Sequence, residues 1–172
     1  GFCEVIGVAY HPEGFIVMKS DGKLFPAVNI ADDDTQQEAV WLSNCHDVGQ
    51  VISNNRGCVI LGKDKRIYKN NQPANYFAQW RDVIGIVDLA DSFAILRGDG
   101  TVRVLSYERD KPRPETPADA WTDIVAIYGG YRRLLGLTKD GKLLVVYTHQ
   151  GWLWSNQAMA MDYVLNWYPV GL

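Results

Sequence analysis

The residue types in this chain best suited to covalent or metal chemistry are three cysteines and three histidines: Cys3, Cys45, Cys58, His11, His46 and His149. Cys45 and His46 are adjacent, as a nucleophile and its base would be in the simplest case. Adjacent side chains of an extended segment point to opposite faces, so this pair is not expected to act together. The six residues show no Cys-x-x-Cys pair and no zinc-binding spacing. We therefore expect no catalytic residue, no metal site and no cofactor, and we expect Cys58 to be a buried, small apolar residue.

A run of three carboxylates, Asp32 to Asp34, is the second candidate for metal chemistry. Such a run could bind Ca²⁺ if alternate side chains faced the ion, but the Asp-x-Asp-x-Asp-Gly spacing of a calcium loop is absent. The sequence therefore predicts a solvated acidic loop over residues 27–40, with a short helical turn at residues 36–41.

Other function classes are disfavoured by composition and by missing motifs. Paired carboxylates in a recognisable frame, a Gly-x-Ser-x-Gly motif and a P-loop are all absent, so enzyme activity is not expected. The net charge of −3 provides no basic surface, so nucleic acid is not an expected partner. No apolar run approaches the roughly 18–20 residues of a membrane span, and no signal peptide is visible, since the sequence opens directly on a predicted strand.

The dominant pattern is an internal repeat. Each unit starts at an acidic residue, repeat position 0, which is Glu4, Asp47, Asp82 or Asp123. Position 4 is β-branched: Val8, Val51, Ile86 and Ile127. Position 14 is apolar: Met18, Leu61, Leu96 and Leu137. Position 17 is aspartate, at Asp21, Asp64, Asp99 and Asp140, and position 20 is aliphatic, at Leu24, Ile67, Val102 and Leu143. The starts are 43, 35 and 41 residues apart, so insertions fall between units, where loops are expected.

Each unit is predicted to form a strand, a bend, a second strand, a tight turn and a third strand. Asp-Gly pairs such as Asp21-Gly22 are turn signals, because glycine adopts positive φ readily and aspartate caps a tight turn. The residues on both sides of that turn are rich in strand formers. A lone hairpin cannot bury its apolar face, so we expect the units to stack and their aliphatic positions to form a continuous interior.

The fourth unit, from Trp121-Thr-Asp-Ile-Val-Ala-Ile to Thr138-Lys-Asp-Gly-Lys-Leu, resembles an RCC1-type repeat (regulator of chromosome condensation). The third unit, which begins Trp80-Arg-Asp-Val-Ile-Gly-Ile, is similar. The resemblance covers residues 4–146 and implies a β-propeller with about four strands per blade. It also implies a scaffold or interaction platform, since members of that family mostly act as such, while some promote nucleotide exchange on small GTPases or bind chromatin.

The fold class predicted is all-β: a propeller or propeller-like array of four repeats of about 35–43 residues in a single domain spanning residues 1–172. The units are placed at residues 3–44, 45–79, 80–120 and 121–148. The tail, residues 149–172, is expected to supply a strand that closes the ring. The alternatives are that the chain is a piece of a larger propeller, or that two chains together complete one.

The function expected is that of a non-enzymatic binding or scaffold module with a protein partner. The aromatic and arginine residues most able to form a hot spot are Trp152, Trp154, Tyr131, Arg132 and Arg133. Core packing of the closing segment is an equal alternative for the two tryptophans. A carbohydrate-binding module that takes a glycan is the second hypothesis, and regulation of a small GTPase or an enzyme is less favoured. Association into a homo-oligomer is left open.

Overall fold

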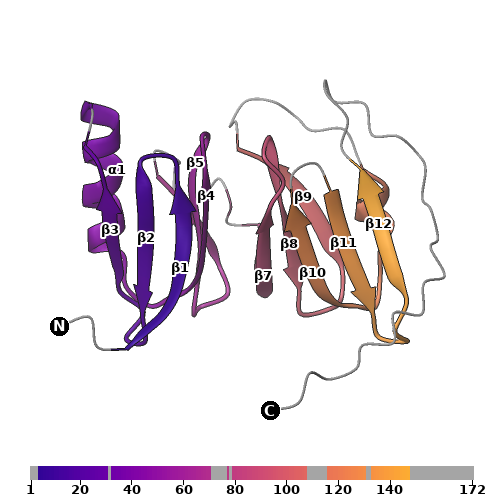
Figure 1. The fold of residues 1–172 in the computed structure, drawn as a ribbon. Helices are drawn as coiled ribbons and strands as arrows, with labels where there is room; N and C mark the ends of the chain where they lie inside the picture. Colours follow the sequence, from indigo (N-terminus) through magenta and orange to yellow (C-terminus); the bar gives the residue numbers. More distant parts are fainter. Residues whose placement is uncertain are drawn as a thin grey trace, which may run out of the picture.

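The computed structural model describes residues 4–30, 32–70, 77, 79–107, 116–130 and 133–147. These residues form twelve strands in four separate three-stranded antiparallel sheets, which we call blades 1 to 4 (Figure 1). The strands are β1 (Val5–His11), β2 (Gly14–Lys19) and β3 (Leu24–Val28) in blade 1; β4 (Val48–Asn54), β5 (Gly57–Gly62) and β6 (Ile67–Lys69) in blade 2; β7 (Val83–Asp88), β8 (Ser92–Arg97) and β9 (Val102–Ser106) in blade 3; and β10 (Ile124–Gly130), β11 (Arg133–Thr138) and β12 (Leu143–Tyr147) in blade 4.

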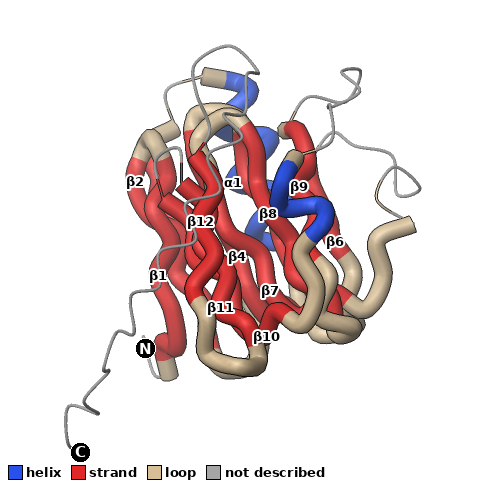
Figure 2. The backbone as a smooth tube through the Cα atoms, turned by 90° about the vertical axis from the view of Figure 1, so that its right-hand side faces the viewer, coloured by secondary structure: helices blue, strands red, loops and turns tan. Residues whose placement is uncertain are grey.

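The blades follow one another in the order of the sequence. The first strand of each blade lies next to the first strand of its neighbour, so β1, β4, β7 and β10 form one side of the array. Figure 2 shows blade 4 in front and the other blades behind it. The arrangement confirms the predicted all-β, propeller-like array of four repeats, with three described strands in each unit.

The acidic residue at repeat position 0 has a conformational role in every blade. Glu4, Asp47, Asp82 and Asp123 all have positive φ, between 56° and 69°. Just after it, the pairing between the first and second strands shifts register, at Val5/Gly7 in blade 1 and at the same repeat positions in the others. Aspartate tolerates this left-handed conformation better than most residues, which explains the recurrence of aspartate at the start of three units.

Position 18, in the turn before the third strand, joins each blade to the next. Its residue has positive φ in all four blades, and its backbone oxygen accepts a hydrogen bond from the N–H of repeat position 1 in the following blade. The three bonds run from Val48 to Gly22 (3.0 Å), from Val83 to Lys65 (3.1 Å) and from Ile124 to Gly100 (3.0 Å). We call this contact the seam bond.

The apolar core consists of three clusters, one between each pair of adjacent blades. The cluster between blades 2 and 3, for example, combines Val59 and Leu61 of β5 with Ile86, Phe93 and Ile95 of β7 and β8. Position 4 is buried in blades 2, 3 and 4, as predicted, with at most 9% exposure. Val8 departs from the prediction: it is 62% exposed, because no described segment covers that face of blade 1.

A helix, α1 (Asp33–Asn44), connects blade 1 to blade 2 and lies beside β3 (Figure 1). It corrects the prediction of a loop over residues 27–40, whereas the helical turn predicted at residues 36–41 falls within it. Asp32 caps the helix, since its carboxylate accepts a hydrogen bond from the backbone N–H of Thr35 at 2.8 Å. Asp33 and Asp34 occupy the first turn, where negative charge is favourable. The acidic run therefore begins a helix, which Leu42 anchors in the cluster between blades 1 and 2.

Candidate binding pocket beside the first helix

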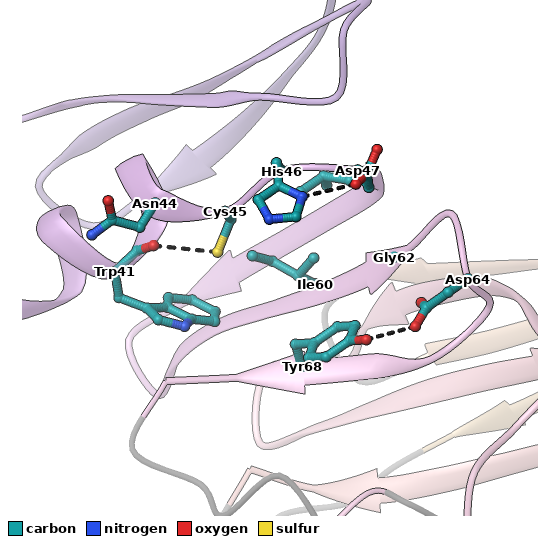
Figure 3. A pocket seen from close by; sticks show the side chains of 10 residues that line it. Trp41, Asn44, Cys45, His46, Asp47, Ile60, Gly62, Asp64 and Tyr68 are labelled. Carbon is teal, nitrogen blue, oxygen red and sulfur yellow. Dashed lines mark hydrogen bonds and ion pairs between the residues drawn. The ribbon is translucent and has the colours of Figure 1, made fainter.

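A pocket of about 340 Å³ lies between the end of α1 and blade 2 (Figure 3). Its lining comes from the end of the helix, the start of β4, the middle and end of β5, the turn after β5, and β6. The lining residues are Trp41, Asn44, Cys45, His46, Asp47, Val48, Ile60, Gly62, Asp64 and Tyr68. The helix insertion therefore supplies one wall and the repeat supplies the rest.

Gly62 explains part of this hollow. It occupies repeat position 15, where the other units have larger side chains: Lys19, Arg97 and Thr138. A Cβ atom at Gly62 would lie 2.5 Å from Oδ1 of Asp64 and 3.0 Å from Cε2 of Tyr68. Only glycine therefore lets these two side chains fold over the end of β5 in their observed positions.

Two of the polar side chains that line the pocket, Asp47 and Asp64, are carboxylates. The Tyr68 hydroxyl donates a 2.6 Å hydrogen bond to Oδ2 of Asp64, and this bond, helped by partial burial, raises the pKa of the phenol. Oδ1 of Asp64 accepts from the backbone N–H of Arg66 at 3.2 Å. Nδ1 of His46 lies 2.8 Å from Oδ2 of Asp47. The lining thus holds two carboxylates and one imidazole, and among the described lining residues there is no lysine or arginine.

Two aromatic rings complete the site. Trp41 is half-buried and Tyr68 is more exposed, and Figure 3 shows both among the side chains that surround the pocket. The faces of aromatic rings attract cations, and the attraction is strongest for tryptophan. Aromatic faces combined with two carboxylates suit an ammonium or guanidinium group better than an anion.

Cys45 and His46 both line the pocket, yet neither is arranged for nucleophilic catalysis. The Cys45 thiol donates to the backbone oxygen of Trp41 at 3.2 Å, and burial raises its pKa. An activated nucleophile requires the opposite shift. His46 directs Nδ1 at Asp47 instead of the thiol. Because both residues line the same pocket, the predicted separation onto opposite faces does not hold, and the expectation that the two do not act together stays a prediction.

A second cluster of reactive side chains lies between α1 and the first two blades. One ligand atom each from His11, Glu38 and Cys58 lies within 4.8 Å of the others, which is close enough to suggest a metal site. However, Nδ1 of His11 accepts the backbone N–H of Glu13 at 3.1 Å, so the ring proton belongs on Nε2, 3.2 Å from Oε2 of Glu38. A metal-bound histidine has the reverse arrangement, with its second nitrogen donating a proton.

Cys58 and Glu38 are likewise committed to hydrogen bonds. The other Glu38 oxygen accepts from the backbone N–H of Cys58 at 3.0 Å, and the Cys58 thiol donates to Ser53 at 3.1 Å. Burial, followed by the charge of Glu38, raises the pKa of the thiol far above its usual range, whereas a metal ligand must be a thiolate. We interpret the cluster as a polar strut that ties the helix to two blades. Cys58 is fully buried, as its strand position indicated.

The hot-spot residues predicted from the sequence are only partly visible. Tyr131, Arg132, Trp152 and Trp154 lie outside the described residues, as does the tail expected to close the ring. Arg133 begins β11 and is exposed, with its guanidinium carbon 5.4 Å from the centre of the Tyr147 ring. The pocket beside α1 was not predicted. Its one sequence signal is Gly62, a glycine at a repeat position that carries larger side chains in the other units.

Comparison with known proteins places this fold. No model of a known protein family matches the chain, and no curated protein matches its sequence. Among solved structures, Prp20p from Saccharomyces cerevisiae superposes with a TM-score of 0.56 at 12% identity, over 85% of this chain and 45% of Prp20p. Yeast RCC1 (Prp20) bound to Kap60 gives a TM-score of 0.55 at 12% identity, over 85% of this chain and 44% of that chain.

The four sheets and these matches together define the class of fold, an arc of β-propeller blades. More narrowly, the blades are RCC1-like, which confirms the resemblance detected in the third and fourth repeats. The chain spans less than half of the length of the two solved structures. Among the described residues, α1 is the longest helix, and no helix has the length and apolar character needed to cross a membrane.

Proposed function

We propose that this chain is a non-enzymatic protein-binding module and that the pocket beside α1 receives a lysine or arginine side chain of the partner. The observation that carries the proposal is the composition of the pocket, in which Trp41 and Tyr68 stand with Asp47 and Asp64. At about 340 Å³ the pocket is at the small end of ligand sites, which suits one side chain better than a large cofactor.

The hydrogen bond from Tyr68 to Asp64 contributes to recognition by holding the carboxylate in place before the ligand arrives. A pre-oriented acceptor loses less conformational freedom on binding, so more of the interaction energy appears as affinity. A cation over the aromatic faces adds roughly 0.5–2 kcal/mol, depending on how completely it is desolvated. A basic side chain would then anchor a contact that continues over the surrounding surface.

The structural neighbours support a protein as the partner. Prp20p was solved in work on its binding to Gsp1p and histones, and yeast RCC1 was solved bound to Kap60. Propeller blades present loops and strand ends that suit such contacts. We retain a second proposed region of this chain for contact with the partner. It consists of the exposed Arg133 together with Tyr131, Arg132, Trp152 and Trp154.

A peptide array tests the proposal. The probes are random heptapeptides with lysine, arginine, leucine or aspartate fixed at the central position. We expect the chain to bind the lysine or arginine series and to lose at least tenfold in affinity when Gly62→Leu fills the pocket. Asp64→Asn should weaken binding several-fold. The matched control is Asp140→Asn, which changes the same repeat position in blade 4, away from the pocket. Equal binding of all four series, or no effect of Gly62→Leu, would refute the pocket as the recognition site.

A glycan is the second candidate ligand. The Trp41 ring could stack on a sugar, with the amide of Asn44 and the carboxylate of Asp64 as polar partners. A glycan array probed with the native chain and with the Gly62→Leu variant separates the two hypotheses. Binding of a defined glycan that Gly62→Leu abolishes, together with no preference among the peptide series, would favour the carbohydrate.

A further inference from the structure

The pocket beside α1 separates its apolar groups from its charged ones. Val48 and Ile60 line it with side chains that are only 1% and 2% exposed, and Gly62 beside them is also buried. The two carboxylates lie toward solvent instead, since the side chains of Asp47 and Asp64 are 71% and 47% exposed. The pocket therefore has an apolar floor and an acidic rim.

The backbone around this floor offers a ligand few acceptors. The backbone oxygen of Gly62 already accepts the N–H of Lys65 at 3.0 Å. That of Asp47 accepts the N–H of Lys63 at 2.7 Å, and that of Trp41 accepts the Cys45 thiol at 3.2 Å. A lysine ammonium carries three N–H donors, and a donor buried without an acceptor costs free energy. An unmodified lysine that reached the floor would leave donors unpaired.

The carboxylate of Asp64 is also partly committed to the protein. Its Oδ2 accepts the Tyr68 hydroxyl at 2.6 Å, and its Oδ1 accepts the backbone N–H of Arg66 at 3.2 Å. The Nε atom of Arg66 lies 3.9 Å from Oδ2, but an exposed pair of this kind contributes little. Asp64 thus supplies negative charge to the rim more readily than hydrogen-bond acceptors to the floor.

The aromatic rings attract a cation without requiring N–H donors. Figure 3 shows the side chain of Ile60 between the rings of Trp41 and Tyr68. Aromatic faces attract positive charge through their quadrupole, which is how aromatic cages bind quaternary ammonium groups. Methylation of lysine replaces N–H donors by methyl groups and keeps the positive charge. A methylated ammonium therefore matches the rings, the apolar floor and the acidic rim together.

We propose that the preferred ligand of this pocket is a methylated lysine side chain of the partner protein, with trimethyl-lysine bound most tightly. The inference rests on the proposed function of the same pocket and specifies its ligand. Each methyl group removes a donor that the floor cannot satisfy and adds apolar surface against Val48 and Ile60. Arginine fits less well, because its guanidinium group carries five donors.

A peptide array with four central residues tests the preference. The probes are random heptapeptides that carry lysine, dimethyl-lysine, trimethyl-lysine or the uncharged carbon analogue of trimethyl-lysine at the centre. We expect affinity to rise at least tenfold from lysine to trimethyl-lysine, and Gly62→Leu to abolish the gain. The uncharged analogue has the same shape without the charge, so it should bind no better than lysine.

The outcomes distinguish this inference from the proposed function. Pocket-dependent binding in which lysine equals or exceeds trimethyl-lysine would overturn the inference and leave the proposed function standing. Equal binding of trimethyl-lysine and its uncharged analogue would show apolar contact alone and would also overturn the inference. If none of the charged series binds, or if Gly62→Leu changes nothing, both are overturned.

Variants of the aromatic residues identify the source of the preference. Trp41→Leu keeps apolar bulk but removes the ring, so it should reduce the preference for trimethyl-lysine over the uncharged analogue by about tenfold. Tyr68→Phe keeps its ring and should retain that preference. The control is Trp80→Leu, which changes a half-buried tryptophan outside the pocket lining and should have no effect. A full preference in Trp41→Leu would overturn the inference.

A titration of the native chain decides the question if Trp41→Leu does not fold. Tetramethylammonium chloride and ammonium chloride are the smallest probes of the two head groups. In NMR spectra we expect tetramethylammonium to shift the indole N–H signal of Trp41 and ammonium to leave it in place at the same concentration. Equal shifts with the two salts, or no shift with either, would overturn the inference.

Discussion

The interface between blades 1 and 2 and the interface between blades 3 and 4 use the same repeat positions but fill them differently. At the first interface, position 11 of blade 2 is the small residue Cys58, and α1 inserts Leu42 and Glu38 beside it. At the third interface, position 11 of blade 4 is Leu134, and the ring of Trp121 covers Gly136 from the same blade. The first interface therefore includes a polar strut, whereas the third is apolar throughout its core cluster.

The difference shows that the repeat constrains the backbone more strictly than it constrains the side chains packed between the blades. The seam bond has nearly the same length at both interfaces, 3.0 Å. The space beside it is filled by an inserted helix in one case and by a tryptophan in the other. Substitutions at the two interfaces should therefore lower the free energy of unfolding for different physical reasons.

The largest effect is expected at the apolar interface, from Gly136→Val. The Cβ atom would lie 2.7 Å from Cζ3 of Trp121 and 2.8 Å from Cε3, so the ring must move out of its place. Overpacking of this kind costs typically 1–3 kcal/mol, and we expect a loss near 3 kcal/mol in the free energy of unfolding, measured with urea. Gly130→Ala is the control, since its Cβ would meet no described atom within 4 Å. Equal losses for the two variants would contradict the role of Trp121.

A smaller effect is expected at the polar strut, from Glu38→Ala. This change removes the acceptor for the backbone N–H of Cys58 and for Nε2 of His11, which leaves two nearly buried donors unpaired. Unpaired buried donors cost about 1–3 kcal/mol, so we expect a loss of about 2 kcal/mol in the same assay. Glu38→Gln keeps one acceptor and should lose about half as much. Gln37 is an exposed neighbour on the same helix, and Gln37→Ala should leave the free energy of unfolding unchanged. Equal losses for Glu38→Gln and Glu38→Ala would argue against two separate hydrogen bonds.

At the remaining interface, between blades 2 and 3, we expect one substitution to raise the free energy of unfolding. In its seam bond the backbone oxygen of Lys65 accepts from the N–H of Val83, and Lys65 has a φ of 63° where the first and third interfaces use glycine. A side chain in this conformation costs about 1–2 kcal/mol, partly offset by the extra freedom of glycine in the unfolded chain. The exposed ion pair between Lys65 and Asp82 contributes little. Lys65→Gly should therefore raise the free energy of unfolding by about 0.5 kcal/mol, whereas Lys65→Ala should not.

The smallest effect concerns the turns that precede the third strands of blades 3 and 4. Hydrogen bonds from Thr138 and Lys142 lower the pKa of Asp140 to about 2, and hydrogen bonds from Thr101 lower the pKa of Asp99. Since the folded pKa of Asp140 is below the unfolded value of about 4, its contribution to stability is present above pH 4 and is lost as the pH falls toward 2. Thr138→Val should raise the pKa of Asp140 in an NMR titration and leave Asp99 unchanged.

Much of the fold could be predicted because its signals are local. The turn at Asp21-Gly22 and the spacing from position 0 to position 20 fix three strands per unit, and repetition of that spacing fixes the stacking. Helix α1 was predicted only as a short turn at residues 36–41, because Asp32 to Asp34 have the composition of a solvated loop and only Ala39 and Leu42 of the helix are buried. The exposure of Val8 could not be predicted, because it depends on what lies against the blade.

The candidate site was harder to predict because it depends on the absence of a side chain at Gly62. Gly62 creates room only because α1 places Trp41 across from it, and the sequence did not indicate that helix in full. The strut could not be predicted from spacing, since His11, Glu38 and Cys58 come from three elements far apart in the chain. The aromatic hot spot centred on Trp152 and Trp154 lies outside the described residues and stays a prediction.

The seam bond has a consequence for how such chains change length during evolution. Because the bond joins main-chain atoms, a duplicated unit brings its own donor and its own acceptor, provided that its positions 0 and 18 carry residues that tolerate positive φ. Gain or loss of a whole unit by recombination would preserve every remaining junction. The number of blades can thus vary between related genes without redesign of the joints, and an engineered chain with a copied third unit should extend the arc by one step.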